Sequence, residues 1–362
     1  MQKEDDSESG GRPPPVELSA LGEDGLIRRI RKAVGPDRER LIRGVGDDAA
    51  VAATAEKSLF TTDLMIEGVH FLLERTPPRL LGRKALAVNL SDIAAMAGTP
   101  KFALLSLGAP PGFSAAAMDQ ILAGFLERAE ETGVALVGGD VCRAERLLIS
   151  VCVIGEVEPP GPVYRSGAAV DDLLFVTGEL GDAGLGLKRL LDLAPPVTEE
   201  LIAGDPLAGP LRRHLDPDPR LGEGRRLAGK ATAMMDLSDG LLADLPRLLL
   251  ESKVPGAEIE LERVPLSAQF QKHFQVKDRL AGEALQTALG GGEDYELLFT
   301  APAGLESELL TLGAQGVSIA RIGRLSGEPG LRLLDRDGAA VDCPAPAFEH
   351  FAVPGRNRGA GS

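Results

Sequence analysis

The segment Glu158–Ser166 (EPPGPVYRS) holds three prolines and a glycine, a composition that ends helices and strands. It divides a chain of 362 residues, a length that suits two domains of ordinary size. We therefore predict an N-terminal domain over residues 21–157 and a C-terminal domain over residues 158–352. Residues 1–20 are predicted to be a disordered tail, because they are too polar to offset the entropy of ordering, and residues 353–362 a polar tail.

The spacing of apolar residues predicts helices and strands in both parts. In the N-terminal part it predicts helices over residues 23–33, 78–96 and 114–133 and strands over residues 49–53, 58–62, 103–107, 135–137 and 147–157. In the C-terminal part it predicts strands over residues 173–177, 231–235 and 295–300, helices over 183–193, 221–228 and 240–251, and a loop over 194–220. Asp182 is expected to cap the helix that follows it. Because each half mixes both element types without a strict βαβ repeat, we predict an α+β (mixed α/β) fold.

The formal net charge of −15 limits the partners that the protein surface can bind. Nucleic acids and anionic lipids are bound mainly through Lys and Arg, so we expect neither a nucleic acid nor a membrane as a partner. A phosphorylated substrate would be repelled as well, unless metal ions intervene. No apolar run approaches the roughly 18 residues of a membrane span, and residues 1–15 lack the apolar core of a signal peptide. We therefore expect a cytoplasmic protein.

The cysteines and histidines point to no common catalytic or metal site. The three cysteines contain no CxxC pair, so neither a disulfide framework nor a zinc site is indicated. None of the four histidines lies beside a plausible serine or cysteine nucleophile. His70, in the run GVHF, could face a site, but a histidine whose hydrogen bonds are satisfied at a strand edge explains it equally well.

Aspartates beside small residues are the densest chemical signal in the sequence. They occur in GVGDDAAV (Asp47, Asp48), TTDLM (Asp63), NLSDIAAM (Asp92), GGDVC (Asp140), MMDLSDGL (Asp236, Asp239) and GGGEDYEL (Glu293, Asp294). Mg²⁺ takes oxygen ligands, commonly one or two carboxylates together with substrate phosphates. Each aspartate alone is explained as well by a turn or a helix N-cap. Asp92 is harder to explain in this way, because it interrupts an apolar helical pattern, and Asp239 shares one turn with Asp236 and Ser238.

Two familiar phosphate-binding motifs are approached but not met. The run GRRLAGKA, residues 224–231, lacks the Ser or Thr that would bind magnesium in a P-loop. It also joins a predicted helix to a predicted strand, the reverse of the P-loop order. The run GVGDDA, residues 44–49, imitates a dinucleotide fingerprint, but its two aspartates would face the pyrophosphate. Neither motif is a real match.

Taken together, the motifs resemble the thiamine-monophosphate kinase family, whose superfamily includes aminoimidazole ribonucleotide synthetase and selenophosphate synthetase. The resemblance runs in order from about Gly22 to Phe351. Its elements are GVGDDAAV, TTDLMIEGVHF, KALAVNLSDIAAMAGTP, GGDVCR, RSGA, MMDLSDGLLADL, GGGEDYELLFT and FEHF. Any one of these motifs would be weak alone, whereas the ordered set is specific.

The resemblance implies a role for each matching position. Metal ligands or their support are implied at Asp48, Thr62, Asp63, Asp92, Asp140, Asp236 and Asp239, and the catalytic positions among the aspartates are Asp48, Asp92 and Asp239. Nucleotide contacts are implied at Gly139, Asp140, Arg165 and Ser238, and substrate contacts at His70, Glu293 and Phe348. Phe348 stands where relatives often carry Tyr or Trp, and VCR follows GGD where many have TTR.

The resemblance also implies an activity and its partners. The reaction would be the ATP-dependent phosphorylation of thiamine monophosphate to thiamine diphosphate, with several Mg²⁺ ions around the phosphates. The N-terminal sheet would pair with that of a second subunit in a homodimer. Within the superfamily the alternatives are an ATP-dependent ligase, a selenophosphate synthetase and a hydrogenase-maturation protein. A non-catalytic nucleotide-binding regulator is the alternative from another class, and would be marked by lost metal-binding aspartates.

Overall fold

The computed structural model describes residues 29–30, 32–34, 41–43, 51–52, 57–276, 280–313, 316 and 318–344. The two predicted tails and the site candidates Asp48 and Phe348 lie outside the described residues, as does most of the predicted helix over residues 23–33. The parts of that helix that the structure describes, from Arg29 onward, are helical. Strands β1 (Leu41–Arg43) and β2 (Val51–Ala52) form a short antiparallel pair.

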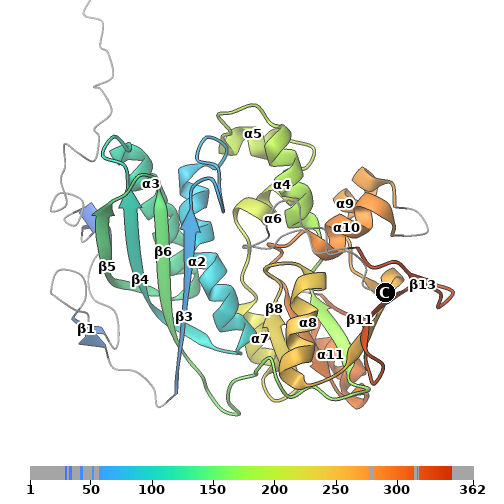
Figure 1. The fold of residues 1–362 in the computed structure, drawn as a ribbon. Helices are drawn as coiled ribbons and strands as arrows, with labels where there is room; N and C mark the ends of the chain where they lie inside the picture. Colours follow the sequence, from blue (N-terminus) through green and yellow to red (C-terminus); the bar gives the residue numbers. More distant parts are fainter. Residues whose placement is uncertain are drawn as a thin grey trace, which may run out of the picture.

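The N-terminal part is a four-stranded sheet with two long helices on one face (Figure 1). The strands lie in the order β3 (Ser58–Ile66), β6 (Leu148–Glu156), β4 (Thr99–Ala109) and β5 (Ala135–Arg143). The helices are α2 (Pro78–Ala95) and α3 (Ala115–Thr132). They touch at Gly82 and Gly124, where an added Cβ would lie 1.8 Å from a carbonyl oxygen of the other helix. Glycine at both positions therefore allows α2 and α3 to pack backbone to backbone.

The C-terminal part is built on a seven-stranded mixed sheet. Its strands follow in the order β13 (Ala340–Val341), β12 (Gly330–Leu334), β9 (Gly256–Glu260), β11 (Ile319–Ser326), β7 (Leu173–Thr177), β10 (Leu297–Ala301) and β8 (Ala233–Asp236). All pairs are antiparallel except β12 with β9. The central strands β7 and β10 are buried along their whole length, and Phe175 stacks on Phe299 with ring centroids 5.2 Å apart.

Helices surround this second sheet. They are α4 (Asp182–Asp192), α5 (Glu199–Gly204), α6 (Ala208–Leu215), α7 (Leu221–Leu227), α8 (Leu241–Ser252), α9 (Ala268–Phe274), α10 (Gly282–Gly290) and α11 (Glu306–Gly313), with 3₁₀ turns at Leu261–Arg263 and Ala303–Leu305. None of the described helices combines the length and the apolar character that crossing a bilayer requires.

Helix α2 joins the two parts, because it packs on β3, β4 and β6 on one side and on β8 and α7 on the other (Figure 1). Most of its apolar side chains belong to one core that also holds residues of β7, β8 and β10. Fourteen of its 18 residues are buried, and these include the polar or charged residues Lys84, Asn89 and Ser91. A polar side chain on such a helix needs a partner from another element.

The predicted α+β class is confirmed by this mixture of helices and two mixed sheets. The helices predicted over residues 78–96 and 114–133 and the strand over 173–177 are also confirmed. Helix α3 begins after Ser114, whose hydroxyl accepts the N–H of Ala117, and ends at Gly133, which has a left-handed φ of 73°. These boundaries follow local chemistry that the sequence displays.

Two predictions in the C-terminal part are wrong. Residues 194–220 are not a loop, since they contain α5 and α6, and the buried face of α6 packs on α4. Asp182 does not cap α4. It is the first residue of that helix, and its carboxylate accepts the hydroxyl of Ser267 at 2.8 Å. The N–H groups of Gly181 and Ala183 bind instead the carboxylate of Asp294, at 2.9 and 3.2 Å. A residue distant in the sequence thus replaces the expected local cap.

Candidate active site

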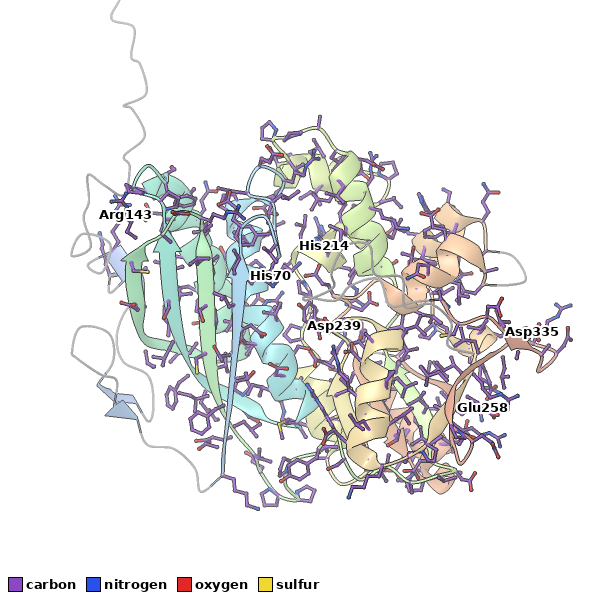
Figure 2. The ribbon with its side chains drawn as sticks, viewed as in Figure 1. His70, Arg143, His214, Asp239, Glu258 and Asp335 are labelled. Atoms are coloured by element: carbon purple, nitrogen blue, oxygen red, sulfur yellow. The ribbon has the colours of Figure 1, made fainter. Side chains whose placement is uncertain are left out.

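A cavity of about 540 Å³ lies where α2 meets the C-terminal elements. Its lining comes from β3, the loop that follows β3, α2, α4, α6, the turn after β8, and residues 291–295. The labelled His70, His214 and Asp239 belong to three of these elements (Figure 2). Lys84, Val88 and Asp92 of α2 all line the cavity at a spacing of four residues, which places them on one helix face. Lys84 and Asp92 are therefore separated by about 12 Å along the helix axis.

The part of the cavity near Asp92 carries four aspartates, Asp63, Asp92, Asp236 and Asp239, and is called the acidic end below. Each comes from a different place: Asp63 from β3, Asp92 from α2, Asp236 from the last position of β8, and Asp239 from the turn before α8. Neighbouring hydroxyls orient two of them. Thr61 donates a short hydrogen bond to Asp92, and Ser91 donates one of 2.7 Å to Asp236.

Burial makes Asp63, Asp92 and Asp236 reluctant to ionise, and repulsion by Asp92 adds to this in Asp63 and Asp236. Burial, followed by the negative charge of Asp92, raises the pKa of Asp63 to about 6 and that of Asp236 to about 7. Burial also raises the pKa of Asp92. The positive charge of Arg165 opposes this rise in Asp92 and Asp236, so its guanidinium acts on the same end of the cavity. Such shifts gather at functional sites and favour cations nearby.

Within the described part of the chain, no three His, Cys, Asp or Glu side chains gather closely enough to hold an ion by themselves. The carboxylates instead line the cavity from separate elements. This arrangement suits Mg²⁺, which keeps several waters and shares its remaining ligands with substrate phosphates. The donor set therefore fits metal ions that arrive together with a phosphorylated ligand.

Asp239 is held by a basic side chain. Arg247 Nη1 lies 2.6 Å from Asp239 Oδ2 and 2.7 Å from Asp244 Oδ1, and Asp244 Oδ2 accepts the backbone N–H of Asp239 at 3.0 Å. Burial raises the pKa of Asp244 to about 6. The guanidinium of Arg247 therefore provides the positive charge beside Asp239 in this structure.

The opposite part of the cavity, near Lys84, is largely apolar and is called the apolar end. Its apolar lining is formed by Leu64, Met65, Val69, Phe71, Leu72, Leu187, Leu190 and Leu191. His70 lies in the same loop as Val69, and its Nδ1 accepts the N–H of Ile66 at 3.1 Å. In the neutral ring the proton is then on Nε2. This end offers a surface for a flat, mostly apolar ring.

One ionic cluster lies beside this apolar lining. Lys84 Nζ lies 2.9 Å from Glu293 Oε1, and His214 Nδ1 lies 3.0 Å from Glu293 Oε2. Burial, then the positive charge of Lys84, lowers the pKa of His214. Burial alone would raise the pKa of Glu293, but Lys84 and His214 together hold it well below its usual range. Glu293 is therefore an ionised carboxylate with a fixed orientation.

The structure brings seven of the predicted site residues to this cavity: Asp63, Asp92, Asp236, Ser238, Asp239, His70 and Glu293. Four others, Thr62, Gly139, Asp140 and Arg165, are described but do not line the cavity, although the charge of Arg165 acts on its acidic end. Thr62 points to the opposite face of the sheet, where its hydroxyl binds Val151 O at 3.0 Å. Gly139 and Asp140 lie on the edge strand β5, and Asp63 is in register with Gly139 across β6 and β4. That distance is about 14 Å, or three strand spacings.

Three titratable residues of the cavity lining were not predicted: Lys84, His214 and Tyr295. Lys84 could have been found by the argument used for Asp92, since it also interrupts the apolar pattern of α2. His214 lies in the segment that was expected to be a loop. Tyr295 is buried between the two ends, and burial, followed by the charges of Glu293 and Asp236, raises its pKa well above the usual range.

Comparison with known proteins shows to which family a chain with this fold and cavity belongs. The models of the N-terminal and C-terminal domains of AIR synthase related proteins match residues 46–157 and 169–336. A thiamine-monophosphate kinase of Aquifex aeolicus is 38% identical over 290 residues, which are 79% of this chain and 88% of that protein. The chain belongs to the thiamine-monophosphate kinase family of AIR synthase related proteins.

Solved structures of this family have the same fold. The thiamine-monophosphate kinase of Stenotrophomonas maltophilia K279a matches with a TM-score of 0.74 at 34% identity, over 89% of this chain and 98% of that one. AaThiL complexed with AMPPCP and TMP matches with a TM-score of 0.70 at 34% identity, over 94% and 100% of the two chains. The family resemblance that the ordered motifs indicated is thereby confirmed.

Proposed function

We propose that this chain transfers the terminal phosphoryl group of ATP to thiamine monophosphate, forming ADP and thiamine diphosphate. One observation carries the proposal: Asp63, Asp92 and Asp236, from three separate elements, share one cavity in which burial raises their pKa values. Such a site is costly unless cations neutralise it. The relative complexed with AMPPCP and TMP supports both the ATP and the thiamine monophosphate assignments.

The cavity orients the substrate. We place the phosphates at the acidic end and the ring system at the apolar end, beside Glu293. The separation of about 12 Å between Lys84 and Asp92 along α2 suits a molecule whose ring and phosphate recognise different surfaces. His70 can donate from Nε2 at the apolar end, whereas Ser238 and Arg165 serve the acidic end.

The reaction needs little acid–base chemistry from the protein. The nucleophile is a phosphate oxygen of the substrate, which is largely ionised at neutral pH because the second phosphate pKa is about 6. What remains is positioning and neutralisation of charge. Mg²⁺ held by Asp63, Asp92, Asp236 and Asp239 would neutralise the phosphate oxygens and help to align them. Arg165 adds a positive charge on the ATP side, and Thr61 and Ser91 orient two of the carboxylates.

The remaining predicted ligands are explained best by a homodimer. Thr62 and Asp140 share the face of the N-terminal sheet opposite to α2, as the strand register requires. That face also carries Phe60, which is 72% exposed in the single chain. We propose that the sheet of a second subunit covers this face and completes the surroundings of Gly139 and Asp140. The domain boundary within Glu158–Ser166 and a cytoplasmic location are parts of the same proposal.

The direct test is incubation of the purified protein with ATP, Mg²⁺ and thiamine monophosphate, followed by chromatographic separation of the thiamine species. We expect thiamine diphosphate to appear only with Mg²⁺ and in equal amount to ADP. ADP without thiamine diphosphate, or no reaction at all although ATP binds, would contradict the proposed function. The ligase and selenide substrates of the superfamily would then be tested.

A further inference from the structure

The ionic cluster of the apolar end contains more charge than the proposed reaction uses. The side chains of Lys84 and His214 are only 3% and 6% exposed, whereas that of Glu293 is 29% exposed. Each oxygen of the carboxylate meets one of the two basic groups, and each keeps a lone pair for a further donor. The part of Glu293 that remains accessible belongs to the cavity lining. Glu293 is thus held by Lys84 and His214, and its exposed part faces the cavity.

The histidine of this cluster has a fixed position, but its buried Nδ1 atom lacks a well-formed hydrogen bond. His214 Nδ1 is buried, and although it lies 3.0 Å from Glu293 Oε2, it makes no hydrogen bond of good geometry with any described residue. Its position is set by the preceding residue of α6. Arg213 binds Glu296, which is fully buried and is also bound by Arg220 and Thr177. The helix therefore holds the imidazole against Glu293 by contacts that are independent of Glu293.

The backbone beneath the carboxylate is strained and fixed. Glu293 and Tyr295 have φ values of 60° and 50°, in the left-handed region that non-glycine residues rarely adopt. Such a conformation is unfavourable for a residue with a side chain and persists only where its surroundings impose it. Here the N–H groups of Glu293 and Tyr295 donate to Ser238 O and Leu237 O at 2.7 and 2.9 Å. Both backbone and side chain thus fix the direction in which Glu293 points.

A purely structural role does not account for this arrangement. A buried ion pair often contributes no net stability, and apolar residues of similar volume commonly replace it without loss. The cluster also lies in a cavity wall that is otherwise apolar, where an acceptor of fixed direction discriminates between ligands. A carboxylate accepts hydrogen bonds and cannot donate them when ionised. Its preferred partner is an N–H donor on a ring, above all one on a cationic or amidine-like heterocycle.

We propose that Lys84 and His214 are positioning residues which hold Glu293 as a fixed acceptor for the ring amino group of the substrate, and so determine which ring the enzyme accepts. The inference rests on the proposed function, since thiamine monophosphate carries an aminopyrimidine ring and a cationic thiazolium. It goes beyond that function by assigning the choice of ring to two residues that need not touch the substrate. Phosphorylated compounds without such a donor are then poor substrates.

The test compares thiamine monophosphate with its analogue in which oxygen replaces the exocyclic amino group, oxythiamine monophosphate. For the natural chain we expect kcat/KM to be at least roughly tenfold lower with the analogue, because the fixed carboxylate then faces a carbonyl oxygen in place of the exocyclic amino donor. In Lys84→Met, the KM for thiamine monophosphate should rise roughly tenfold while kcat and the KM for ATP change less than about threefold. The preference over the analogue should shrink in the same variant.

Two controls separate positioning from folding. Lys230→Met removes a lysine that pairs with Glu308 on the surface and should change none of these constants. His214→Asn keeps a donor near the position of Nδ1 and should keep the preference, whereas His214→Ala should lose it. If Lys84→Met does not fold, the two His214 variants test the positioning role instead. The measured quantity is the ratio of kcat/KM for thiamine monophosphate to kcat/KM for the oxygen analogue.

The outcomes distinguish the two proposals. If the natural chain does not convert thiamine monophosphate, the proposed function is wrong. If it does, but Lys84→Met and His214→Ala keep the full preference for the amino ring, the function stands and this inference is wrong. A fall in kcat with unchanged KM values in both variants would also contradict a positioning role at the ring.

Discussion

The backbone N–H of Glu293 donates a 2.7 Å hydrogen bond to the carbonyl oxygen of Ser238. This bond joins the two ends of the cavity, because Glu293 belongs to the apolar end and Ser238 to the turn that carries Asp239. A second bond, from Tyr295 N–H to Leu237 O at 2.9 Å, runs beside it. The two segments therefore form one unit, and a displacement of either is transmitted to the other.

Gly292→Ala should disturb both ends at once. Gly292 has a φ of +65°, and an added Cβ would lie 2.9 Å from Ser238 O, closer than real contacts allow. We expect a loss of about 1–3 kcal/mol in the free energy of unfolding. We also expect kcat to fall and the KM for thiamine monophosphate to rise, measured by steady-state kinetics. Gly222→Ala is the matched control, since nothing lies within 4 Å of its added Cβ and it lies in helix α7. Equal kinetic effects in the two variants would contradict this coupling.

Asp92→Asn should lower turnover by roughly two to four orders of magnitude, through loss of a charge that the phosphate-bound metal requires. The fold should persist, because the amide oxygen can still accept the hydroxyl of Thr61. Measured kcat at saturating and limiting Mg²⁺, together with the unfolding temperature, checks both statements. Asp119→Asn, which removes a surface partner of Arg29, should leave turnover unchanged. Near-normal activity of Asp92→Asn at limiting Mg²⁺ would exclude Asp92 as a ligand.

Asp236→Asn should stabilise the metal-free protein at alkaline pH. The pKa of Asp236 is raised from 3.8 to about 7 in the folded protein, so the folded state binds this proton more tightly than the unfolded state does. The resulting contribution to the free energy of unfolding is complete below pH 3.8 and is lost as the pH rises through 7. Because the amide carries no charge, the variant escapes this loss. The difference in unfolding free energy between variant and natural chain should therefore grow from pH 5 to pH 8, to about 1–3 kcal/mol. Thermal unfolding across this range, in the presence of a chelator, measures it, and a difference that does not vary with pH would contradict the argument.

Mg²⁺ with a phosphorylated ligand should stabilise the natural chain against thermal unfolding. Binding to the folded state alone adds about 2.7 kcal/mol at a ligand concentration one hundred times its Kd. We expect the shift in unfolding temperature to require Mg²⁺ and nucleotide together, because the aspartates do not form a complete ion site by themselves. The shift should be smaller in Asp236→Asn. A full shift with Mg²⁺ alone would instead indicate a preformed metal site.

Arg247→Met should lower the Mg²⁺ concentration that gives half-maximal activity, by roughly threefold, because an ion no longer competes with the guanidinium for Asp239. Turnover at saturating Mg²⁺ should change little. Arg263→Met is the matched control, since Arg263 pairs with Glu260 on the surface and has the same exposure of 49%. An increased Mg²⁺ requirement in Arg247→Met would show that Arg247 helps to hold Asp239 in place rather than competing with the metal.

Local patterns predicted much of the fold. Helices α2 and α3 were predicted nearly to their ends because apolar spacing, a serine cap and a terminal glycine act within a few residues. Strand β7 was predicted because it is a short, wholly apolar run. Helix α6 was missed because it is short, begins without a side-chain cap, and packs its buried face on α4, a contact that local spacing does not reveal.

The sequence by itself determined the chemistry of this protein: the aspartate motifs, their order and the family to which they belong. Only the tertiary structure decided which of these residues meet. It placed Asp63, Asp92 and Asp236 around one cavity, left Thr62 and Asp140 on the other face of the sheet, and added Lys84 and His214 beside Glu293. The physical reason is that a charge buried on one element needs a partner, and that partner comes from elements distant in the chain. Asp294, which binds the start of α4 in place of the expected Asp182, follows the same rule.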